Sequence, residues 1–247
     1  MSTTILSCRD LTVRFGGFTA LRRITADFES GKTCAIIGPN GAGKTTLINV
    51  LSGILKPSEG SVHLNNQDIT ALRPDQRARR GMGRSFQIVK VFSEMTARQN
   101  LRVAAQQARY AMQPFWFPAG RNPQIEKVVD EALVLVGLSA LADTEAAFLS
   151  HGKQRALELG LSLINSPSLL LLDEPLAGVG HAELGEMTRL LDTVRKGRTT
   201  VIIEHNMDAV MSMADEIIVL VAGEVLVRGA PDVVSADHQV RSAYLGH

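Results

Sequence analysis

The sequence predicts an α/β fold with a mostly parallel sheet core, an antiparallel β part near the N-terminus and an inserted α-helical lobe. Three patterns indicate this fold. Short apolar runs alternate with helical patterns after residue 167, which is typical of a parallel sheet covered by helices on both faces. Polar and apolar residues alternate near the start of the chain, as they do in strands with one buried face. Between these parts, residues 96–163 follow a mostly helical pattern.

The segments before and after the helical block are therefore expected to form one core together, with the helical block inserted between them in the chain as a lobe of its own. Proline and glycine break the helical pattern over residues 113–123, but no repeat or low-complexity tract accompanies the break. We expect a single domain over the whole chain. Its core should comprise residues 1–95 and 166–247, and its helical subdomain should lie at about residues 96–165.

Two short strands are predicted near the N-terminus. Apolar residues alternate with polar ones at Leu11, Val13 and Phe15, and a Gly-Gly pair then turns the chain. Alternation resumes over residues 20–28. Strands joined by a tight turn pair antiparallel, and this pair is the predicted N-terminal β part.

A glycine-rich loop follows, between a buried strand and a helix. Residues 33–37 form a short apolar run, and apolar residues recur at helical spacing over residues 44–55. Residues 38–45, the phosphate loop, match G-x-x-x-x-G-K-T in the strand–loop–helix context that this motif requires. The fold is therefore predicted to be that of a P-loop NTPase. The residues expected to bind the nucleotide phosphates are Gly38, Pro39, Asn40, Gly41, Ala42, Gly43, Lys44, Thr45 and Thr46.

The phosphate loop has the chemistry of an anion site. Its glycines allow backbone N–H groups to turn toward one point, and the following helix N-terminus adds partial positive charge. Lys44 is expected to reach the β- and γ-phosphates and to act in catalysis, and Thr45 to supply a hydroxyl ligand to Mg²⁺. ATP and Mg²⁺ are the expected cofactors. A glycine-rich turn followed by a chance Lys-Thr pair is the structural alternative.

Two carboxylates follow a run of four leucines, residues 169–172. Such a run predicts a strand buried on both faces, and ligands of parallel sheets bind at the carboxyl ends of the strands. Asp173 is expected to hold Mg²⁺, and Glu174 to orient and deprotonate the attacking water. Phosphoryl transfer depends mainly on such positioning and charge neutralisation. A solvated strand end is the structural alternative for this pair.

Two further polar residues are candidates for the same site. His205 comes just after the apolar run of residues 201–203, at the sheet edge where Asp173 is expected, and could contact a γ-phosphate. Gln87 could reach Mg²⁺ or the attacking water. A lone His after a strand is usually structural, and a Gln in this spacing is more often a surface residue.

The composition argues against several other classes. The net charge is +1, and nucleic-acid binders usually show a basic excess, so no nucleic-acid partner is expected. Cys8 and Cys34 do not form a C-x-x-C pair, and Cys34 is expected to be a small buried hydrophobe. There is no signal-peptide pattern at the start, and no apolar run approaches the roughly 20 residues of a spanning helix. We expect a cytoplasmic chain whose membrane role comes through a partner.

Residues 149–155, the signature segment, read Leu-Ser-His-Gly-Lys-Gln-Arg and precede the strand that ends at Asp173. Along the chain, the phosphate loop comes first, the signature segment second and the two carboxylates third. Together, in this order, they resemble the ATP-binding cassette (ABC) family, whose signature is usually written L-S-G-G-Q. The resemblance covers nearly the whole chain. It implies that this segment begins a helix and binds the γ-phosphate of ATP held by the opposite subunit, and that the helical lobe is a signature subdomain. The signature positions are Ser150, His151, Gly152 and Lys153, of which Ser150 and Gly152 match the contact residues.

The resemblance also assigns roles to three single positions. Phe15 matches an aromatic residue that stacks on adenine, although a core position is the alternative. Gln87 matches the residue of a loop that links the nucleotide site to the helical lobe and the membrane subunit. His205 matches the switch histidine of the family.

The chain departs from the family pattern at four positions. His151 replaces the first signature glycine, and Lys153 replaces the usual glutamine. Gly180 stands where many relatives carry an aspartate that helps two subunits communicate, and Asn206 stands where Asp is common. The departures spare the residues expected to act in hydrolysis, which are Lys44, Asp173, Glu174 and His205.

Within the family the chain is most similar to ATPases of branched-chain amino-acid uptake. Three features carry this resemblance: Phe-Gly-Gly from Phe15, Leu-Ser-His-Gly in the signature segment, and Ala-Tyr-Leu-Gly over residues 243–246. It implies an importer energy subunit for branched-chain or other hydrophobic amino acids. Urea or short-chain amide import, export, and a soluble role on ribosomes or DNA are the alternatives. The last requires paired cassettes or long coiled coils, which this chain lacks.

The resemblance also implies the partners. One phosphate loop and one signature segment make half of each of two shared sites, so a second ABC ATPase subunit is expected, either a copy or a sister chain. Two transmembrane permease subunits and a substrate-binding protein complete the system. The chain is expected on the cytoplasmic face of the membrane. Candidate surface contacts on its helical lobe are Phe92, Met95 and residues 115–117, with core positions as the alternative.

Overall fold

The computed structural model describes residues 3–85, 91–110 and 122–245. The chain forms two compact units, and each is described by itself. The first comprises residues 1–84, 168–174 and 195–247, and the second comprises residues 85–167 and 175–194. Among the described helices, none is both long enough and apolar enough to span a bilayer.

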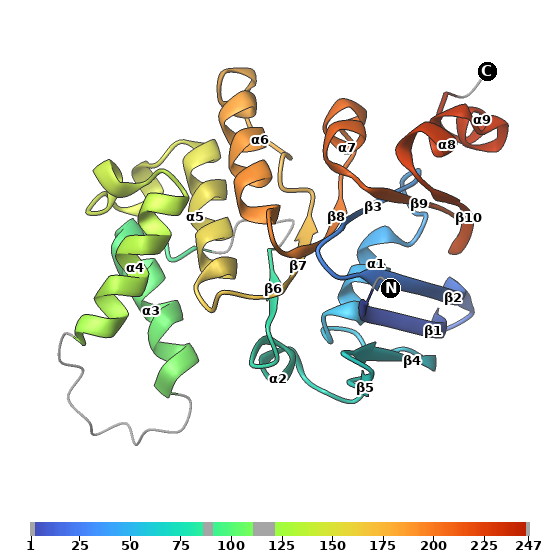
Figure 1. Ribbon diagram of the computed structural model, residues 1–247, viewed down its shortest axis with the longest axis horizontal. Coiled ribbons are helices and arrows are strands. Elements are labelled where there is room, and N and C mark those ends of the chain that lie inside the picture. Colours follow the sequence, from blue (N-terminus) through green and yellow to red (C-terminus); the bar gives the residue numbers. More distant parts are fainter. Residues whose placement is uncertain (1–2, 86–90, 111–121, 246–247) are drawn as a thin grey trace. The chain divides into compact units, whose positions relative to one another are not determined.

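A six-stranded sheet forms the centre of the first unit (Figure 1). Strands β9, β3, β8, β7 and β6 pair in parallel, and among the described strands of this sheet only β10 pairs antiparallel, with β9. The prediction of a mostly parallel sheet is confirmed. In spatial order the strands are β10 (Glu224–Gly229), β9 (Glu216–Val221), β3 (Thr33–Ile37), β8 (Thr199–Ile203), β7 (Leu169–Asp173) and β6 (Met82–Arg84).

The second sheet of this unit is antiparallel and has four strands. The predicted N-terminal pair is confirmed as β1 (Thr4–Phe15) and β2 (Phe18–Glu29), joined at the Gly-Gly turn. Two strands that the sequence did not indicate, β4 (Glu59–Leu64) and β5 (Gln67–Asp68), extend the sheet beyond β1. Both carry polar residues on exposed positions, so neither has the apolar run of a buried strand.

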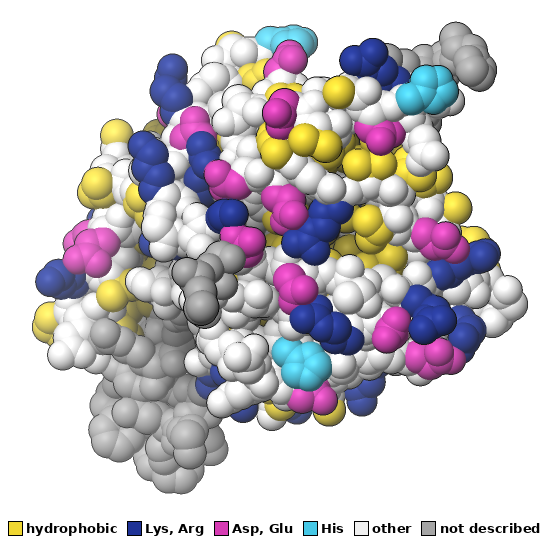
Figure 2. All heavy atoms as spheres, turned by 45° about the vertical axis from the view of Figure 1, so that its right-hand side comes forward, with side chains coloured by type: hydrophobic (Ala, Val, Ile, Leu, Met, Phe, Trp, Pro, Cys, Tyr) yellow, Lys and Arg dark blue, Asp and Glu magenta, His cyan; other side chains and the backbone are white. Residues whose placement is uncertain are grey.

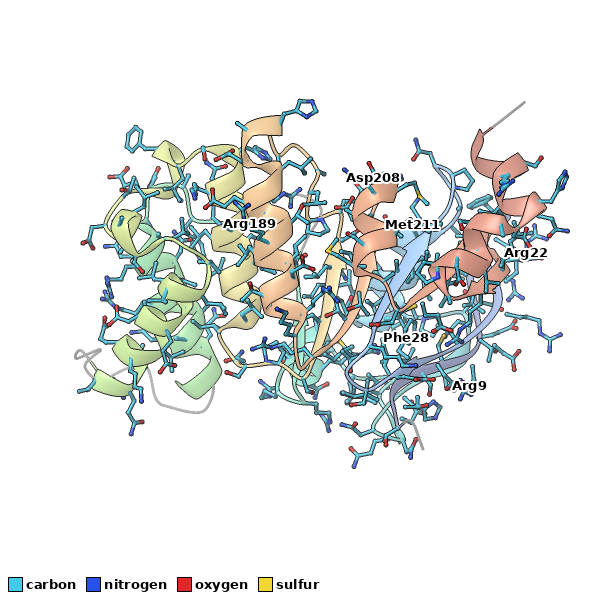
Figure 3. All side chains as sticks on the ribbon, turned by 45° about the horizontal axis from the view of Figure 1, so that its top comes forward. Arg9, Arg22, Phe28, Arg189, Asp208 and Met211 are labelled. Atoms are coloured by element: carbon cyan, nitrogen blue, oxygen red, sulfur yellow. The ribbon has the colours of Figure 1, made fainter. Side chains whose placement is uncertain are left out.

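The core of the first unit lies between buried strand faces and α1 (Lys44–Leu51). All five residues of β3, of β7 and of β8 are buried, as the apolar runs predicted. Phe28, labelled in Figure 3, is only 1% exposed and packs in the same core. Cys34 is also buried there, which confirms its role as a small hydrophobe. The remaining helices of the unit are α2 (Pro74–Ala78), α7 (Met207–Met213), α8 (Pro231–Ala236) and α9 (His238–Leu245).

Helix α1 ends at Leu51, so the prediction that it continues to residue 55 is wrong. The guanidinium group of Arg77, only 1% exposed, donates to the carbonyl oxygens of Val50 and Leu51 over 2.8 and 2.7 Å, and to that of Thr70 over 3.1 Å. Carbonyl groups at a helix C-terminus lack partners within the helix. Arg77 supplies these partners from α2, and Gly53 with φ +81° then turns the chain away.

The second unit is helical, as predicted. Figure 1 shows α3 (Ala97–Tyr110), α4 (Pro123–Leu135) and α5 (His151–Leu163) side by side. Their apolar faces enclose a separate hydrophobic cluster that includes Leu101, Val129 and Leu157. Two short 3₁₀ turns, η1 (Ser139–Leu141) and η2 (Ala146–Phe148), connect α4 to α5, and α6 (His181–Arg195) completes the unit.

Charged residues of both signs share the surface. Figure 2 shows Lys and Arg interspersed with Asp and Glu on the face that it presents. Many of them form exposed ion pairs, such as Arg9 with Asp27 and Arg14 with Glu59. The mixture agrees with the net charge of +1.

Candidate active site

The phosphate loop connects β3 to α1 in a shape that only glycine allows at two points. Gly38 has φ +154°, and a Cβ on it would lie 2.1 Å from the carbonyl oxygen of Leu220. Gly43 has φ +102°, and a Cβ there would lie 2.8 Å from the carbonyl oxygen of Ala20. Gly43 is also the N-cap of α1 and has no side chain to cover the N–H groups of the first turn. The loop thus presents an uncovered helix N-terminus, as an anion site requires.

The Lys44 side chain is folded back onto this loop. Its ammonium group donates to the carbonyl oxygens of Gly38 and Pro39 over 2.7 and 3.0 Å, and the residue is 6% exposed. Burial lowers the pKa of Lys44, while the nearby carboxylates of Glu174 and Asp173 act in the opposite direction. An ammonium group has three donors, so one is left for a phosphate oxygen after these two bonds.

The register of the parallel strands brings the predicted residues to one edge of the sheet. Ile203 on β8 pairs with Ile36 on β3 and with Asp173 on β7. These three residues are therefore level. The chain beyond Ile36 leads to the phosphate loop, the chain beyond Ile203 to His205, and the chain beyond Asp173 to Glu174. This edge is formed by the carboxyl ends of the strands, where parallel sheets bind ligands.

Asp173 is 1% exposed, and its carboxylate lies beside a partly buried cation. Arg84, at the end of β6, places Nη2 3.9 Å from Asp173 Oδ2. The same guanidinium donates to Asn49 Oδ1 over 2.6 Å and to the hydroxyl of Ser52, both in or next to α1. Burial lowers the pKa of Arg84, and the charge of Asp173 opposes this. Arg84 therefore connects β7 with the helix that follows the phosphate loop. A single arginine in the sequence does not indicate this role.

Glu174 has a left-handed backbone with φ +50°, which is uncommon for a residue with a side chain. Its N–H donates to the carbonyl oxygen of Ile203 over 2.9 Å, which holds the residue against β8. Its Oε1 lies 3.0 Å from His205 Nε2. A strained backbone held in this way is frequent at active sites. The carboxylate and the imidazole are thus in direct contact at the sheet edge.

Local hydrogen bonds hold the segment around His205. The side chain of Glu204 accepts from the N–H groups of His205 and Asn206 over 3.0 and 3.3 Å. Asn206 caps α7, because its Oδ1 accepts from the N–H of Ala209 over 3.0 Å. An asparagine at this position therefore acts as an N-cap, a role that Asp also serves well.

The oxygen donors at this edge suit a magnesium ion. Thr45 carries a hydroxyl in the first turn of α1, where it is half-buried, and Asp173 carries a carboxylate at the end of β7. Mg²⁺ prefers such oxygen ligands and is usually held by one or two carboxylates together with substrate phosphates. Gln87, the third predicted ligand, lies outside the described residues.

Phe15 is the last residue of β1, and its side chain is 52% exposed. The core alternative for Phe15 is therefore wrong. Across the tight turn it pairs with Phe18, which is 63% exposed and which the sequence did not single out. Two exposed aromatic rings thus stand at the end of the β1–β2 hairpin.

The signature segment lies in the second unit. Ser150 is the N-cap of α5, and its hydroxyl oxygen accepts from the N–H of Lys153 over 3.3 Å. The predicted helix start is therefore present at this residue. The ring of His151 packs on Gly178, because a Cβ on that glycine would lie 2.8 Å from His151 Cε1. Lys153 pairs with Glu186 of α6. Both departures from the family signature thus have contacts within the unit.

Of the candidate surface contacts on the helical lobe, Phe92 is 58% exposed and Met95 is half-buried. A core position for Phe92 is wrong. Residues 115–117 and 246, which the sequence also singled out, lie outside the described residues.

Comparison with known proteins extends over the whole chain. Residues 21–177 match the family model described as ABC transporter. The chain is 37% identical to the high-affinity branched-chain amino acid transport ATP-binding protein BraF of Pseudomonas aeruginosa, over 100% of this chain and 99% of BraF. It is 38% identical to LivG of Escherichia coli K12, which carries the same description, with equal coverage.

Solved structures give the same result. An ATP-binding cassette of an ABC transporter in its ADP conformation matches with a TM-score of 0.85 and 32% identity, covering 99% of both chains. A dimeric bacterial ABC transporter cassette shares the fold, with a TM-score of 0.79 at 24% identity over 92% of this chain and 99% of that one. Sequence and fold agree from end to end, so the chain belongs to the ABC transporter family of ATP-binding cassettes and is an ATPase.

Proposed function

We propose that this chain is the ATP-binding and hydrolysing subunit of an importer for branched-chain or other hydrophobic amino acids. The observation that supports the cargo is the similarity to BraF and LivG over the full chain. The observation that supports the chemistry is the contact of Glu174 with His205 at the sheet edge that the phosphate loop shares.

The site residues have the following roles in this proposal. Lys44 binds the γ-phosphate through the donor that its loop contacts leave available. Glu174 takes a proton from the attacking water, and His205 orients Glu174 and the γ-phosphate. The phosphate-binding residues 38–46 and Phe15, as an adenine contact, complete the nucleotide site.

Magnesium fits the oxygen donors of this edge. Thr45 and Asp173 would hold it together with Gln87, and when bound it would neutralise charge on the transferred phosphoryl group. Arg84 keeps the Asp173 carboxylate in a fixed position relative to α1. The chain's own part of the reaction is thus to hold phosphates, carboxylate and water in line.

The proposal includes the assembly. A second ABC ATPase subunit, a copy or a sister chain, closes on this one so that ATP at each phosphate loop meets the Ser150 and Gly152 donors of the other subunit. Two permease subunits and a substrate-binding protein complete the importer, with this chain on the cytoplasmic face of the membrane. Residues 1–95 and 166–247 act as the catalytic core and about 96–165 as the signature subdomain.

Uptake measurements test the cargo. Deletion of the gene should abolish high-affinity uptake of labelled leucine, isoleucine or valine, and the parent chain should restore it while Glu174→Gln should not. Labelled urea serves as the comparison substrate. Loss of urea uptake with unchanged leucine uptake would replace the proposed cargo with a short amide, and co-purification only with ribosomes or DNA would contradict the transport role.

A further inference from the structure

The carboxylate of Glu183 accepts hydrogen bonds from the two groups of the signature segment that are proposed to bind phosphate, the Ser150 hydroxyl and the Gly152 N–H. The hydroxyl of Ser150 donates to Glu183 Oε1 over 2.6 Å, and the N–H of Gly152 donates to Glu183 Oε2 over 3.3 Å. Glu183 lies in the first turn of α6 and is half-buried. A hydroxyl and a backbone N–H at a helix N-terminus form an arrangement that equally suits a phosphate.

The absence of a side chain at Gly152 permits this contact. A Cβ at Gly152 would lie 2.6 Å from Glu183 Oε2 and 2.8 Å from Glu183 Cδ. Both distances are far shorter than van der Waals contact, so a larger residue would push the carboxylate away from the N–H. The fit between Gly152 and Glu183 is thus a property of the single chain.

We propose that, in the separated subunit, Glu183 accepts the hydrogen bonds of the Ser150 hydroxyl and the Gly152 N–H. The γ-phosphate of the partner's ATP then has to displace the Glu183 carboxylate from these two groups. This inference rests on the proposed function, which assigns Ser150 and Gly152 to that phosphate. The Ser150 hydroxyl has one proton to donate, so it cannot serve both anions at once. Two anions at one helix N-terminus would also repel each other. Glu183 therefore raises the ATP concentration at which two subunits close.

The structure provides room for the displaced side chain. A cavity of about 210 Å³ adjoins the contact, and its lining includes Val136, Gly152, Lys153, Glu183, Glu186 and Arg189. Arg189, labelled in Figure 3, lies further along α6. Two cationic side chains, those of Lys153 and Arg189, line this cavity together with the Glu186 carboxylate, which pairs with Lys153. A Glu183 carboxylate that turns into the cavity therefore remains near Arg189.

A neighbouring ion pair provides the matched control. Lys153 donates to Glu186 Oε1 over 2.5 Å, so Glu186 also connects α5 to α6. Its contact does not involve the Ser150 hydroxyl or the Gly152 N–H. If the γ-phosphate has to displace the Glu183 carboxylate from Ser150 and Gly152, removal of the charge of Glu183 will ease subunit pairing and removal of the charge of Glu186 will not.

The test measures ATP-dependent pairing of the full-length chain by light scattering, with Glu174→Gln in every sample to prevent turnover. Glu183→Ala should lower the ATP concentration for half-maximal pairing on the order of tenfold, because a charge-assisted contact no longer competes. Glu183→Gln should lower it less, and Glu186→Gln should leave it unchanged. Nucleotide binding by the unpaired chain should be the same in all variants. An unchanged or higher ATP requirement in Glu183→Ala would overturn the inference.

Hydrogen exchange without ATP provides an independent measurement. The Gly152 amide should exchange on the order of tenfold faster in Glu183→Ala than in the parent, because its acceptor is removed. Unchanged exchange would show that the contact does not exist in solution and would also overturn the inference. Failure of every variant to pair, with ATP bound, would instead contradict self-pairing in the proposed function, and the exchange rates would still decide the role of Glu183.

Discussion

His205 Nε2 lies 3.0 Å from Glu174 Oε1, and the two residues come from the ends of adjacent strands. The imidazole can therefore fix the carboxylate that is proposed to accept a proton from water. Because Glu174 is also held through its backbone N–H to Ile203, its position depends on β8 at two points. This arrangement makes the effects of substitution specific enough to predict.

Replacement of Glu174 by Gln should retain ATP binding and lower turnover by at least about a hundredfold, because an amide cannot accept the proton. Turnover and nucleotide affinity should be measured on the same preparation. Glu59→Gln is the control, since Glu59 is an exposed carboxylate that pairs with Arg14 and belongs to the four-stranded sheet rather than to the six-stranded one. Parent-like hydrolysis by Glu174→Gln would remove Glu174 as the base.

Replacement of Lys44 by Met should weaken ATP binding roughly tenfold to a hundredfold, through loss of a charge-assisted contact to phosphate. The methionine keeps the apolar part of a side chain that is 6% exposed, so the fold should persist. Lys56→Met, at an exposed position, should bind ATP as the parent does. Equal affinities of the two variants in a titration with fluorescent ATP would contradict the phosphate contact.

Replacement of Arg77 by Ala should lower the free energy of unfolding by about 3 kcal/mol, because it removes hydrogen bonds from a buried cation to several carbonyl groups. Burial lowers the pKa of Arg77 to about 10, so the side chain is still charged at neutral pH. Urea unfolding provides the measurement. Arg79→Ala, which removes an exposed ion pair with Asp75, should change stability by less than about 1 kcal/mol. Similar losses in both variants would argue against a special role for Arg77.

The two thiols should resist alkylation in the native protein at pH 8. Burial raises the pKa of Cys8 from 9.0 to about 12 and raises that of Cys34 as well. The folded state therefore keeps these thiol protons at a pH where the unfolded state releases them. The free energy of unfolding consequently falls as the pH rises from about 9 toward 12. Labelling with iodoacetamide should require urea, whereas Ala140→Cys, at an exposed position, should react at once. Fast native labelling of both cysteines would contradict their burial.

Elements with strong local patterns could be predicted from the sequence. The leucine run of β7 and the strand, loop and helix around Lys44 depend on residues adjacent in the chain. Strand β6 has three residues, one of them glycine, and exists because β7 pairs with it. The early end of α1 depends on Arg77, 26 residues beyond Leu51. Such features come from tertiary contacts that no local pattern contains.

The residues of the candidate site also fall into two groups, those that a local motif predicts and those that depend on tertiary contacts. Its motif residues could be named because phosphate loops have a fixed spacing. The positions of Asp173 and His205 at one edge followed from strand order, which the sequence only implied. Arg84 and Glu183 were missed, since each is a single charged residue whose partner lies on another element. Phe15 had two readings, and only its exposure excludes the core.

The contacts of Arg77 also affect the electrostatics of α1. A helix has a macrodipole that is positive at its N-terminus and negative at its C-terminus, and a cation at the C-terminus stabilises it. Helix α1 has eight residues and is therefore roughly 12 Å long. The buried charge of Arg77 compensates the negative end of this short helix from inside the protein, where salt screens poorly. Without Arg77, the negative end of α1 would lower the positive potential at the phosphate loop. With Arg77 in place, this reduction is smaller.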